Sequence, residues 1–424
     1  MQSAITTLSR PRRPVSVAVR PAPARRSREV LPDLVMLAVL PGDASRVGDT
    51  LPSCVVRDTS GDGQDAFVEH LRLRGREGLE ALPGLSNREP TRLRDAVRIA
   101  MGAGASAVDV VLVKVPGLRP WDLADDDVVH SVTPILSTLV GAVIVFPDLA
   151  GPPDVGHVVD EGDEARVERV RQVVKAYGAH LTEAYQVAFL DCPPLAGERV
   201  GDLLYAAANS DCALFRWRGA GRPLARHGWR SAAALAGGVV ASSAGNVLAP
   251  VSGVTVPLEG GRTVSTGRRE ALAIGPAAED LHREEDDYII DVEARGDDTA
   301  AILSDSLMRA PMGLWSIPAT RMAKVIHYRV MQTASRFVFE QADLPRAVAL
   351  STAVQNALAP FADAGLLAGP EGQGRPVVKG SVVRDRSAPG LRLDLAAQLR
   401  PWAHSVSVQV SLRPGGVPQV VERA

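Results

Sequence analysis

Few residues in this 424-residue chain have the types and the spacing that catalysis requires. Cys192 follows Asp191 directly and His227 lies downstream, a set from which a thiol nucleophile and its imidazole base could be assembled. One cysteine and a distant histidine specify no family pattern, and Cys192 also ends an apolar run before Pro193 and Pro194. We therefore interpret Cys192 as a small apolar residue at the end of a buried strand.

A second combination has the oxygen spacing of an EF-hand calcium loop. Its members are Asp58, Ser60, Asp62, Gly63, Gln64 and Glu69. Asp65 stands where such loops have an apolar residue, and the preceding segment has the pattern of a strand instead of a helix. We favour a plain polar turn at 58–69, and we expect no metal and no cofactor.

Three common enzyme signatures are missing from the sequence: the G-x-x-x-x-G-K-[ST] loop, the G-x-S-x-G elbow and the H-E-x-x-H motif. With no catalytic residue to name, we expect the chain not to be an enzyme. The open alternative is a cytosolic α/β enzyme of unrecognised type that uses the carboxyl ends of its strands.

Composition predicts a globular protein with more than one compact unit. Hydrophobic residues make up 46% of the chain, aromatic residues only 4%, and the net charge is −2, so its cores must be built mainly from Ala, Val and Leu. Cys54, Cys192 and Cys212 lie far apart without disulfide-framework or zinc spacing, which predicts a reducing, cytoplasmic environment. The charge-free run Ser231–Leu258 contains glycines, serines and two prolines, and we expect no membrane insertion.

Apolar runs alternate with helical patterns through the first half of the chain. The predicted strands are Leu34–Leu40, Ser53–Arg57, Val108–Val115, Ala142–Phe146, Gln186–Asp191 and Cys212–Trp217. The predicted helices occupy 64–103, with a break at Pro83 and Gly84, then 126–140, 163–178 and 198–208. This alternation predicts an α/β fold with a mixed, partly parallel sheet flanked by helices.

The second half begins with a Gly- and Pro-rich stretch and ends in strands. A strand is predicted at Tyr288–Glu293, helices at 320–336 and 344–362, and strands at Pro376–Val383, Leu391–Ala396, Ser405–Leu412 and Val417–Val421. We divide the chain into a basic arm at 1–32, an α/β region at 33–245, a loop and strand region at 246–312, a C-terminal α/β segment at 313–413 and a C-terminal arm at 414–424.

The basic arm contains one short strand pattern. Val15, Val17 and Val19 alternate with small residues, and the local sequence offers this strand no partner. Seven arginines stand among the prolines of the arm, with no acidic residue before Glu29. They could pair with acidic residues of a neighbouring molecule such as Glu284–Asp287, contact nucleic-acid phosphates, or remain solvated. The arm has no aromatic residues between its arginines, and the chain as a whole has no excess of basic residues. We therefore do not expect it to bind nucleic acid.

An ordered set of segments resembles contractile sheath subunits, the proteins of the contracting outer tube in phage tails and type VI secretion systems. The segments are the Ala-rich run Trp229–Gly253, the Trp-containing strand Gly313–Pro318, the Arg-bearing helix Arg321–Arg329, the phrase FVFE within Arg336–Leu344, and GLLAG at Gly365–Gly369. At the other end, Val15–Asp43 is similar to the start of the small type VI sheath subunit. The chain thus resembles a small and a large sheath subunit fused.

The resemblance implies a sheath-like core domain built from N-terminal and C-terminal parts, with extended terminal arms. It implies a helical homopolymer of this chain around an inner tube protein, bounded by baseplate and cap proteins, which contracts to drive the tube through a target envelope. Neighbouring subunits would exchange strands, with interfacial residues Val15, Val17, Val19, Val406, Val408, Val410, Val420 and Val421. For Val406–Leu412, an ordinary core strand is an equal alternative. A ring-forming tail terminator, cap or baseplate component is the alternative function. No small-molecule substrate is expected, and assembly is expected in the cytoplasm.

Overall fold

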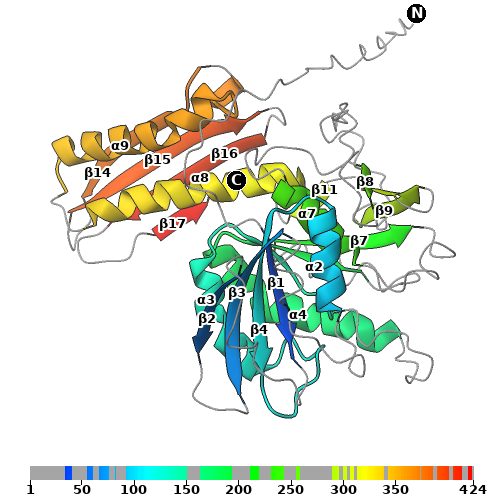
Figure 1. The fold of residues 1–424 in the computed structure, drawn as a ribbon. Coiled ribbons are helices and arrows are strands. Elements are labelled where there is room, and N and C mark those ends of the chain that lie inside the picture. The colour runs from blue at the N-terminus through cyan, green and yellow to red at the C-terminus, as the bar shows by residue number, and fades with distance from the viewer. Residues whose placement is uncertain are drawn as a thin grey trace, which may run out of the picture.

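Short runs rich in Val, Leu and Ile build the central sheet of the protein. The computed structural model describes residues 34–40, 55–60, 66–75, 82, 92–149, 163–192, 211–218, 231–242, 255–257, 289–295, 299–302, 306–309, 313–338, 342–372, 374–384, 389–400, 404–412 and 419–422. They form an α/β unit, which contains this sheet, and a C-terminal unit that begins at residue 317 (Figure 1).

Ten strands of the α/β unit form one sheet in the order β2-β3-β4-β1-β5-β6-β7-β9-β10-β8. In chain order they are β1 (Leu34–Val39), β2 (Val55–Ser60), β3 (Phe67–Arg74), β4 (Ala107–Lys114), β5 (Val143–Val145), β6 (Val187–Asp191), β7 (Cys212–Arg218), β8 (Thr255–Pro257), β9 (Ile290–Arg295) and β10 (Thr299–Ile302). The strands from β4 to β9 in this order are parallel, and antiparallel pairs extend both edges. The predicted mixed, partly parallel sheet is confirmed.

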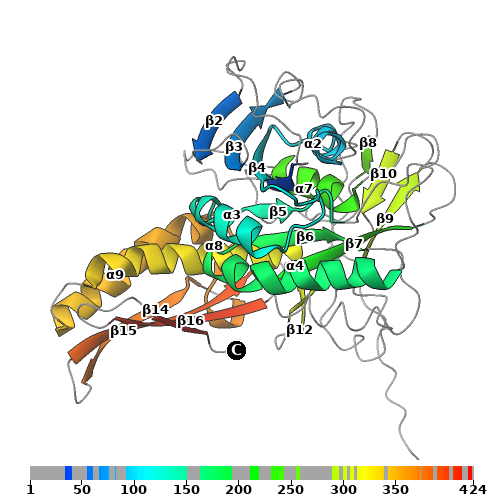
Figure 2. The ribbon, with the colours of Figure 1, turned by 90° about the horizontal axis from the view of Figure 1, so that it is seen from below.

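Helices cover both faces of this sheet. α2 (Leu93–Gly102) and α7 (Ala232–Ser242) pack on one face, and α3 (Asp126–Thr138) and α4 (Asp163–Glu183) on the other (Figure 2). Side chains along β1 alternate between the two cores, because successive residues of a strand point to opposite faces. A strand buried on both faces must be apolar throughout, which explains the run LVMLAV.

α7 packs against both the sheet and its neighbour α2, and every residue but its last is buried. Two adjacent glycines permit this position. A Cβ added to Gly237 would lie 2.7 Å from Leu34 Cδ1 in the sheet, and one added to Gly238 would lie 2.7 Å from Ala100 Cα in α2. The charge-free run Ser231–Leu258 therefore begins with a buried core helix. No helix in the described part of the chain combines the length and the apolar character needed to cross a membrane.

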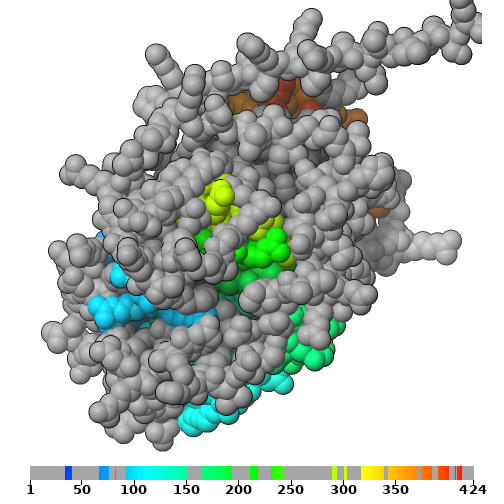
Figure 3. Space-filling view, turned by 90° about the vertical axis from the view of Figure 1, so that its right-hand side faces the viewer, coloured from blue at the N-terminus to red at the C-terminus, as the bar shows by residue number. Residues whose placement is uncertain are grey.

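The far edge of the α/β unit is formed by residues distant in sequence. β9 pairs with β7 in parallel, and β10 and β8 follow it. In the space-filling view of this side, the yellow-green residues of β9 and β10 lie beside the green residues of the β7 and α7 region (Figure 3). Strands from 246–312 thus continue the sheet that begins in 33–245.

The C-terminal unit follows a two-stranded hairpin of β11 (Ser306–Arg309) and β12 (Gly313–Ser316). Its helices are α8 (Ile317–Ala334), continued by a 3-10 turn at Ser335–Phe337, and α9 (Leu344–Asp363). Its strands are β13 (Leu367–Ala368), β14 (Val377–Arg384), β15 (Pro389–Leu399), β16 (His404–Leu412) and β17 (Gln419–Glu422), with a 3-10 turn at Pro370–Gly372. The helices cover one face of this antiparallel sheet, and α8 lies between the sheet and the α/β unit (Figures 1 and 2).

Most predicted elements lie within a few residues of the observed ones, but one prediction is wrong. Residues 67–74 were assigned to a helix, yet they form β3. Phe67, Leu71 and Leu73 lie on one face of β3 and Val68 on the other, a period of two that a half-buried strand produces. The predicted helix at 198–208, the acidic cluster at 284–287 and the basic arm at 1–32 lie outside the described residues.

Gly238→Ala should destabilise the protein. In an open helical position this change raises stability by about 0.5–1 kcal/mol, but here the new methyl group meets the backbone of Ala100, which cannot rotate away. Overpacking of this kind costs about 1–3 kcal/mol. Urea unfolding of the two proteins measures the difference, and an unchanged or higher free energy of unfolding for the variant would contradict the close packing of α7 on α2.

Candidate functional site

The predicted interfacial valines fall into three groups. Val15, Val17 and Val19 lie outside the described residues. Val406, Val408 and Val410 are 4%, 1% and 0% exposed and fill the core between β16 and the helices of the C-terminal unit. Val420 and Val421 belong to β17, where Val420 pairs with Val410 and Val421 with Gln409. Within one chain, the β16 side chains thus serve its own core, and the interfacial role of these valines stays a prediction.

Each outer strand of the C-terminal sheet pairs on one side only among the described residues. β17 has only four residues and pairs with β16 on one side. β14 has eight residues and, within the described part of the chain, pairs with β15 alone. An unpaired strand edge exposes a row of backbone donors and acceptors, which can bind an added strand.

Apolar exposure concentrates near the β14 edge. The large apolar side chains that are exposed in the described residues are Leu344 and Val348 of α9 and Val377 and Val383 of β14. β14 packs beside the first turns of α9, where the backbone of Gly380 approaches Ala347 so closely that a Cβ would not fit. Val377 and Val383 thus lie on β14 itself, and Leu344 and Val348 lie on the helix that packs on it; we call β14 together with these four side chains the β14 edge.

The carboxyl ends of parallel strands are where ligands bind in open α/β sheets. In this protein two buried carboxylates lie there, Asp148 after β5 and Asp191 at the end of β6. Asp148 Oδ1 accepts a hydrogen bond of 2.7 Å from the backbone N of Arg92, the residue before α2. Asp191 accepts hydrogen bonds from Ser231 Oγ at 2.5 Å and from the backbone N of Ala233 at 3.0 Å, at the start of α7. Each carboxylate thus caps a helix N-terminus.

Burial shifts the proton equilibria of both carboxylates. Loss of solvent raises the pKa of Asp148 to about 7, although the hydrogen bond and charge of Arg92 oppose the shift. Burial also raises the pKa of Asp191 to about 6, against the hydrogen bonds from Ser231 and Ala233 and the charge of Arg92. Acids that titrate near neutrality occur in active sites. In nucleotide-binding sheets, however, helix N-termini at this edge bind phosphate groups. Here the N-termini of α2 and α7 instead bind two carboxylates of the chain itself, Asp148 and Asp191.

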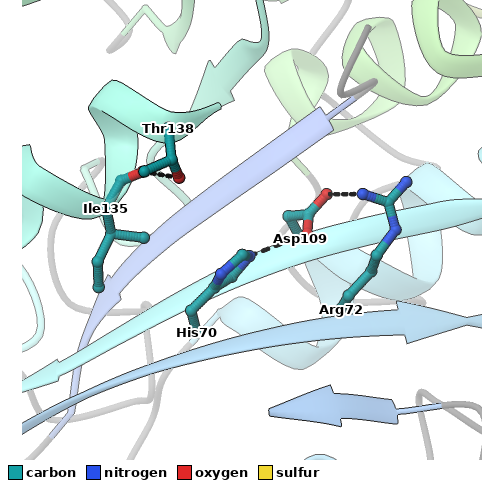
Figure 4. A network of polar contacts seen from close by, with 5 residues as sticks. All are labelled: His70, Arg72, Asp109, Ile135 and Thr138. Atoms are coloured by element: carbon teal, nitrogen blue, oxygen red, sulfur yellow. Dashed lines mark hydrogen bonds and ion pairs between the residues drawn. The ribbon is translucent and has the colours of Figure 1, made fainter. Parts of the chain in front are cut away.

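A third polar cluster joins β3 to β4. Asp109, 2% exposed, accepts from Arg72 Nη1 at 3.2 Å and lies 2.9 Å from His70 Nε2. The three side chains converge on the sheet face near Ile135 and Thr138 of α3 (Figure 4). A histidine and a carboxylate can form a general base, but Asp109 lies near the amino-terminal end of β4, opposite the edge where ligands bind. We interpret this cluster as a cross-strand ion pair that fastens β3 to β4.

The two chemical combinations weighed from the sequence have plain structural explanations. Cys192 is buried directly after β6, and its backbone N donates to Phe215 O at 2.7 Å, while His227 lies outside the described residues. Asp58 and Glu69 lie in the antiparallel strands β2 and β3, whereas an EF-hand loop connects two helices. Among the described residues, no group of three or more His, Cys, Asp or Glu side chains is arranged to hold a metal ion.

Sequence reasoning missed the residues where α8 meets the α/β unit. Lys324 Nζ lies 2.7 Å from Asp211 Oδ2, and their side chains are only 5% and 7% exposed. The rings of Tyr185 and Tyr328 are 5.7 Å apart in an edge-to-face arrangement. The available signal was the helical spacing of Ile317, Lys324 and Tyr328, which places them on one stripe of α8.

Asp148→Asn should change how stability depends on pH. Because the folded-state pKa of about 7 exceeds the ordinary 3.8, the contribution of protonated Asp148 to stability is complete below about pH 4 and is lost as pH rises through 7. Asn keeps the acceptor for Arg92 but cannot ionise. The variant should therefore gain stability relative to the parent protein between pH 4 and 8, by up to about 1.4 kcal/mol per pH unit.

Denaturant unfolding at several pH values measures this difference. Asp95→Asn is the matched control, because Asp95 is exposed on the surface of α2. A stability difference between Asp148→Asn and the parent that stays constant from pH 4 to 8 would show that the Asp148 pKa is not raised.

Comparisons with known proteins identify the fold. The sequence matches no protein-family model, and no curated protein matches it. A chain in the cryo-EM structure of the anti-feeding prophage baseplate, 6-fold symmetrised, superposes with a TM-score of 0.50 and 16% identity, over 83% of this chain and 83% of that one. A chain of the PVC sheath complex of an extracellular contractile injection system, in the contracted state, superposes with a TM-score of 0.48 and 15% identity, over 84% of this chain and 82% of that one. A chain of the contracted helical sheath of the anti-feeding prophage superposes with a TM-score of 0.46 and 16% identity, over 83% of each chain. The chain described here therefore shares its fold with a chain of the anti-feeding prophage baseplate.

Proposed function

We propose that this chain is a structural subunit of a contractile sheath, which polymerises helically around an inner tube and contracts to drive the tube through a target envelope. The observation that carries the proposal is the fold similarity to the baseplate chain, which extends over most of both chains and so takes in both units of this protein. The resemblance of residues 229–413 and of Val15–Asp43 to sheath subunits supports the same assignment.

Strand exchange would join neighbouring subunits. An open helical polymer needs two different surfaces that fit each other, because each copy must bind one neighbour with one surface and the next with another. β14 pairs with β15 on one side only among the described residues and carries the exposed Val377 and Val383, and the strand pattern Val15–Val19 has no partner in its own arm. In the proposed polymer, the arm strand of one copy pairs with the β14 edge of the next.

The C-terminal strand supplies a second possible exchange. β17 is four residues long and is the last strand of its sheet, so few hydrogen bonds hold it in place. Val420 and Val421 would move with β17 to a neighbouring subunit, while Val406, Val408 and Val410 stay in the core beside it.

The proposed subunit acts mechanically, without catalysis. Asp148 and Asp191, the buried acids at the ligand-binding edge of the sheet, serve as helix caps, which gives them a structural role. The proposed partners are further copies of this chain, an inner tube protein, and baseplate and cap proteins, with assembly in the cytoplasm and no small-molecule substrate.

A ring-forming baseplate component is the second candidate. The specific observation in its favour is that the similar chain belongs to a baseplate with sixfold symmetry. A ring needs the same heterologous contact as a helix, but its rotation closes after a fixed number of copies. The shape of the assembly separates the two functions.

Val17→Pro should block polymerisation and leave the subunit folded. Proline removes a backbone donor from the arm strand and therefore a hydrogen bond of the intermolecular ladder. Sedimentation measures polymer formation, and circular dichroism checks the fold. The matched control is Ala24→Pro, which places a proline in the Pro-rich stretch after the strand pattern and should polymerise normally. Normal polymers from Val17→Pro would exclude exchange of this strand.

A further inference from the structure

α8 connects the two units without an intervening loop and belongs to both cores. It follows β12 directly, and its first residue, Ile317, is part of the core that contains α2 and α7. Ala319, Met322 and Ile326 belong to the core of the C-terminal unit. Every residue from Ile317 to His327 is buried. A helix buried on all sides is held by contacts on all sides, so its orientation is tightly determined.

The stripe of α8 that faces the α/β unit carries a cation and a tyrosine. Lys324 Nζ pairs with Asp211 Oδ2 and also donates to Leu181 O at 3.3 Å, near the end of α4. Four residues later, Tyr328 contacts the ring of Tyr185, which follows α4. The contacts from Ile317 to Tyr328 span about 16 Å at 1.5 Å per residue. Contacts spread along this length restrain both the tilt of the helix and its rotation about its axis.

The residues that receive α8 have unusual backbone conformations. Asp211 has a φ of 54° and Tyr185 a φ of 58°, and these are the only residues other than glycine with positive φ in the described part of the chain. This region is sterically unfavourable for residues with a Cβ, especially bulky ones such as tyrosine. Residues in such conformations persist only when the surrounding structure enforces them. Both left-handed residues contact α8, one through an ion pair and one through its ring.

We propose that Tyr185, Asp211, Lys324 and Tyr328 form a clamp that fixes the C-terminal unit at one angle on the α/β unit. We call these four residues the α8 clamp. The ion pair holds Lys324 against one particular residue of the α/β unit. Apolar packing alone would tolerate small rotations of α8 about its axis. The α8 clamp makes the subunit a single rigid body, so that a movement at the β14 edge is transmitted to the α/β unit. The proposal concerns the isolated chain and does not require polymerisation.

The test measures the angle between the units in the monomer, and every protein compared, the parent included, carries Val17→Pro to block polymerisation. Spin labels are introduced as unnatural amino acids at two exposed positions, Gln172 in α4 and Gln355 in α9, which leaves the native cysteines in place. Pulsed electron paramagnetic resonance then gives the distribution of distances between them. The variant is Lys324→Met with Asp211→Asn, which removes both charges together and avoids an unpaired buried charge. Asn also tolerates the left-handed conformation at position 211.

The matched control is Lys175→Met, the same substitution at an exposed lysine of α4, outside the β14 edge. We expect a narrow distance distribution in the parent protein and in the control, and a distribution at least about twice as broad in the double variant. Hydrogen exchange of α8 amides gives a second readout and should accelerate at least about tenfold in the double variant only. An equally narrow distribution with unchanged exchange in the double variant would overturn the proposal, as would a broad distribution in the parent protein.

Discussion

Lys324 and Asp211 are both almost fully buried, and a charge in such a position is stable only while its partner is held beside it. The pair joins α8 to the residue that precedes β7, and the Leu181 carbonyl adds a second acceptor for Lys324. The angle between the two units depends on this contact, because α8 begins in the core of the α/β unit and then contributes many side chains to the core of the C-terminal unit. Asp211 and Tyr185, the two described residues other than glycine with a left-handed backbone, both contact α8.

The two units use their polar and exposed groups in opposite ways. In the α/β unit, Asp148 and Asp191 lie where an enzyme of this fold class would bind its ligand, but both cap helices that pack on the sheet. In the C-terminal unit, the β14 edge carries exposed apolar side chains, and among the described residues β14 has a strand partner on one side only. A protein that binds other copies through strand edges needs such a surface, and it needs a scaffold that does not deform when the surface is pulled. Close packing of α7 through Gly237 and Gly238 contributes to that stiffness.

Local sequence predicted the elements well wherever one pattern dominated. The parallel strand β1 is a continuous apolar run, β4 is apolar from Val110 to Val113, and α9 shows its capping residue, Asp343, directly in the sequence. β3 was mistaken for a helix because charged residues on its half-exposed face interrupt the apolar pattern. The contacts of Lys324 could not be predicted, since Asp211 is more than a hundred residues away and only the folded chain brings them together. The strand pattern of the basic arm predicts an intermolecular partner, but its local sequence cannot identify which edge it meets.

The central claim is that this chain assembles into a helical sheath through heterologous contacts between its copies. Negative-stain electron microscopy of the purified full-length chain, beside a version that lacks residues 1–28, tests it most directly. We expect long striated tubes of variable length from the full-length chain and single particles from the shortened one. Closed rings of uniform size from the full-length chain would favour the baseplate component instead, and single particles from both would contradict assembly through the arm.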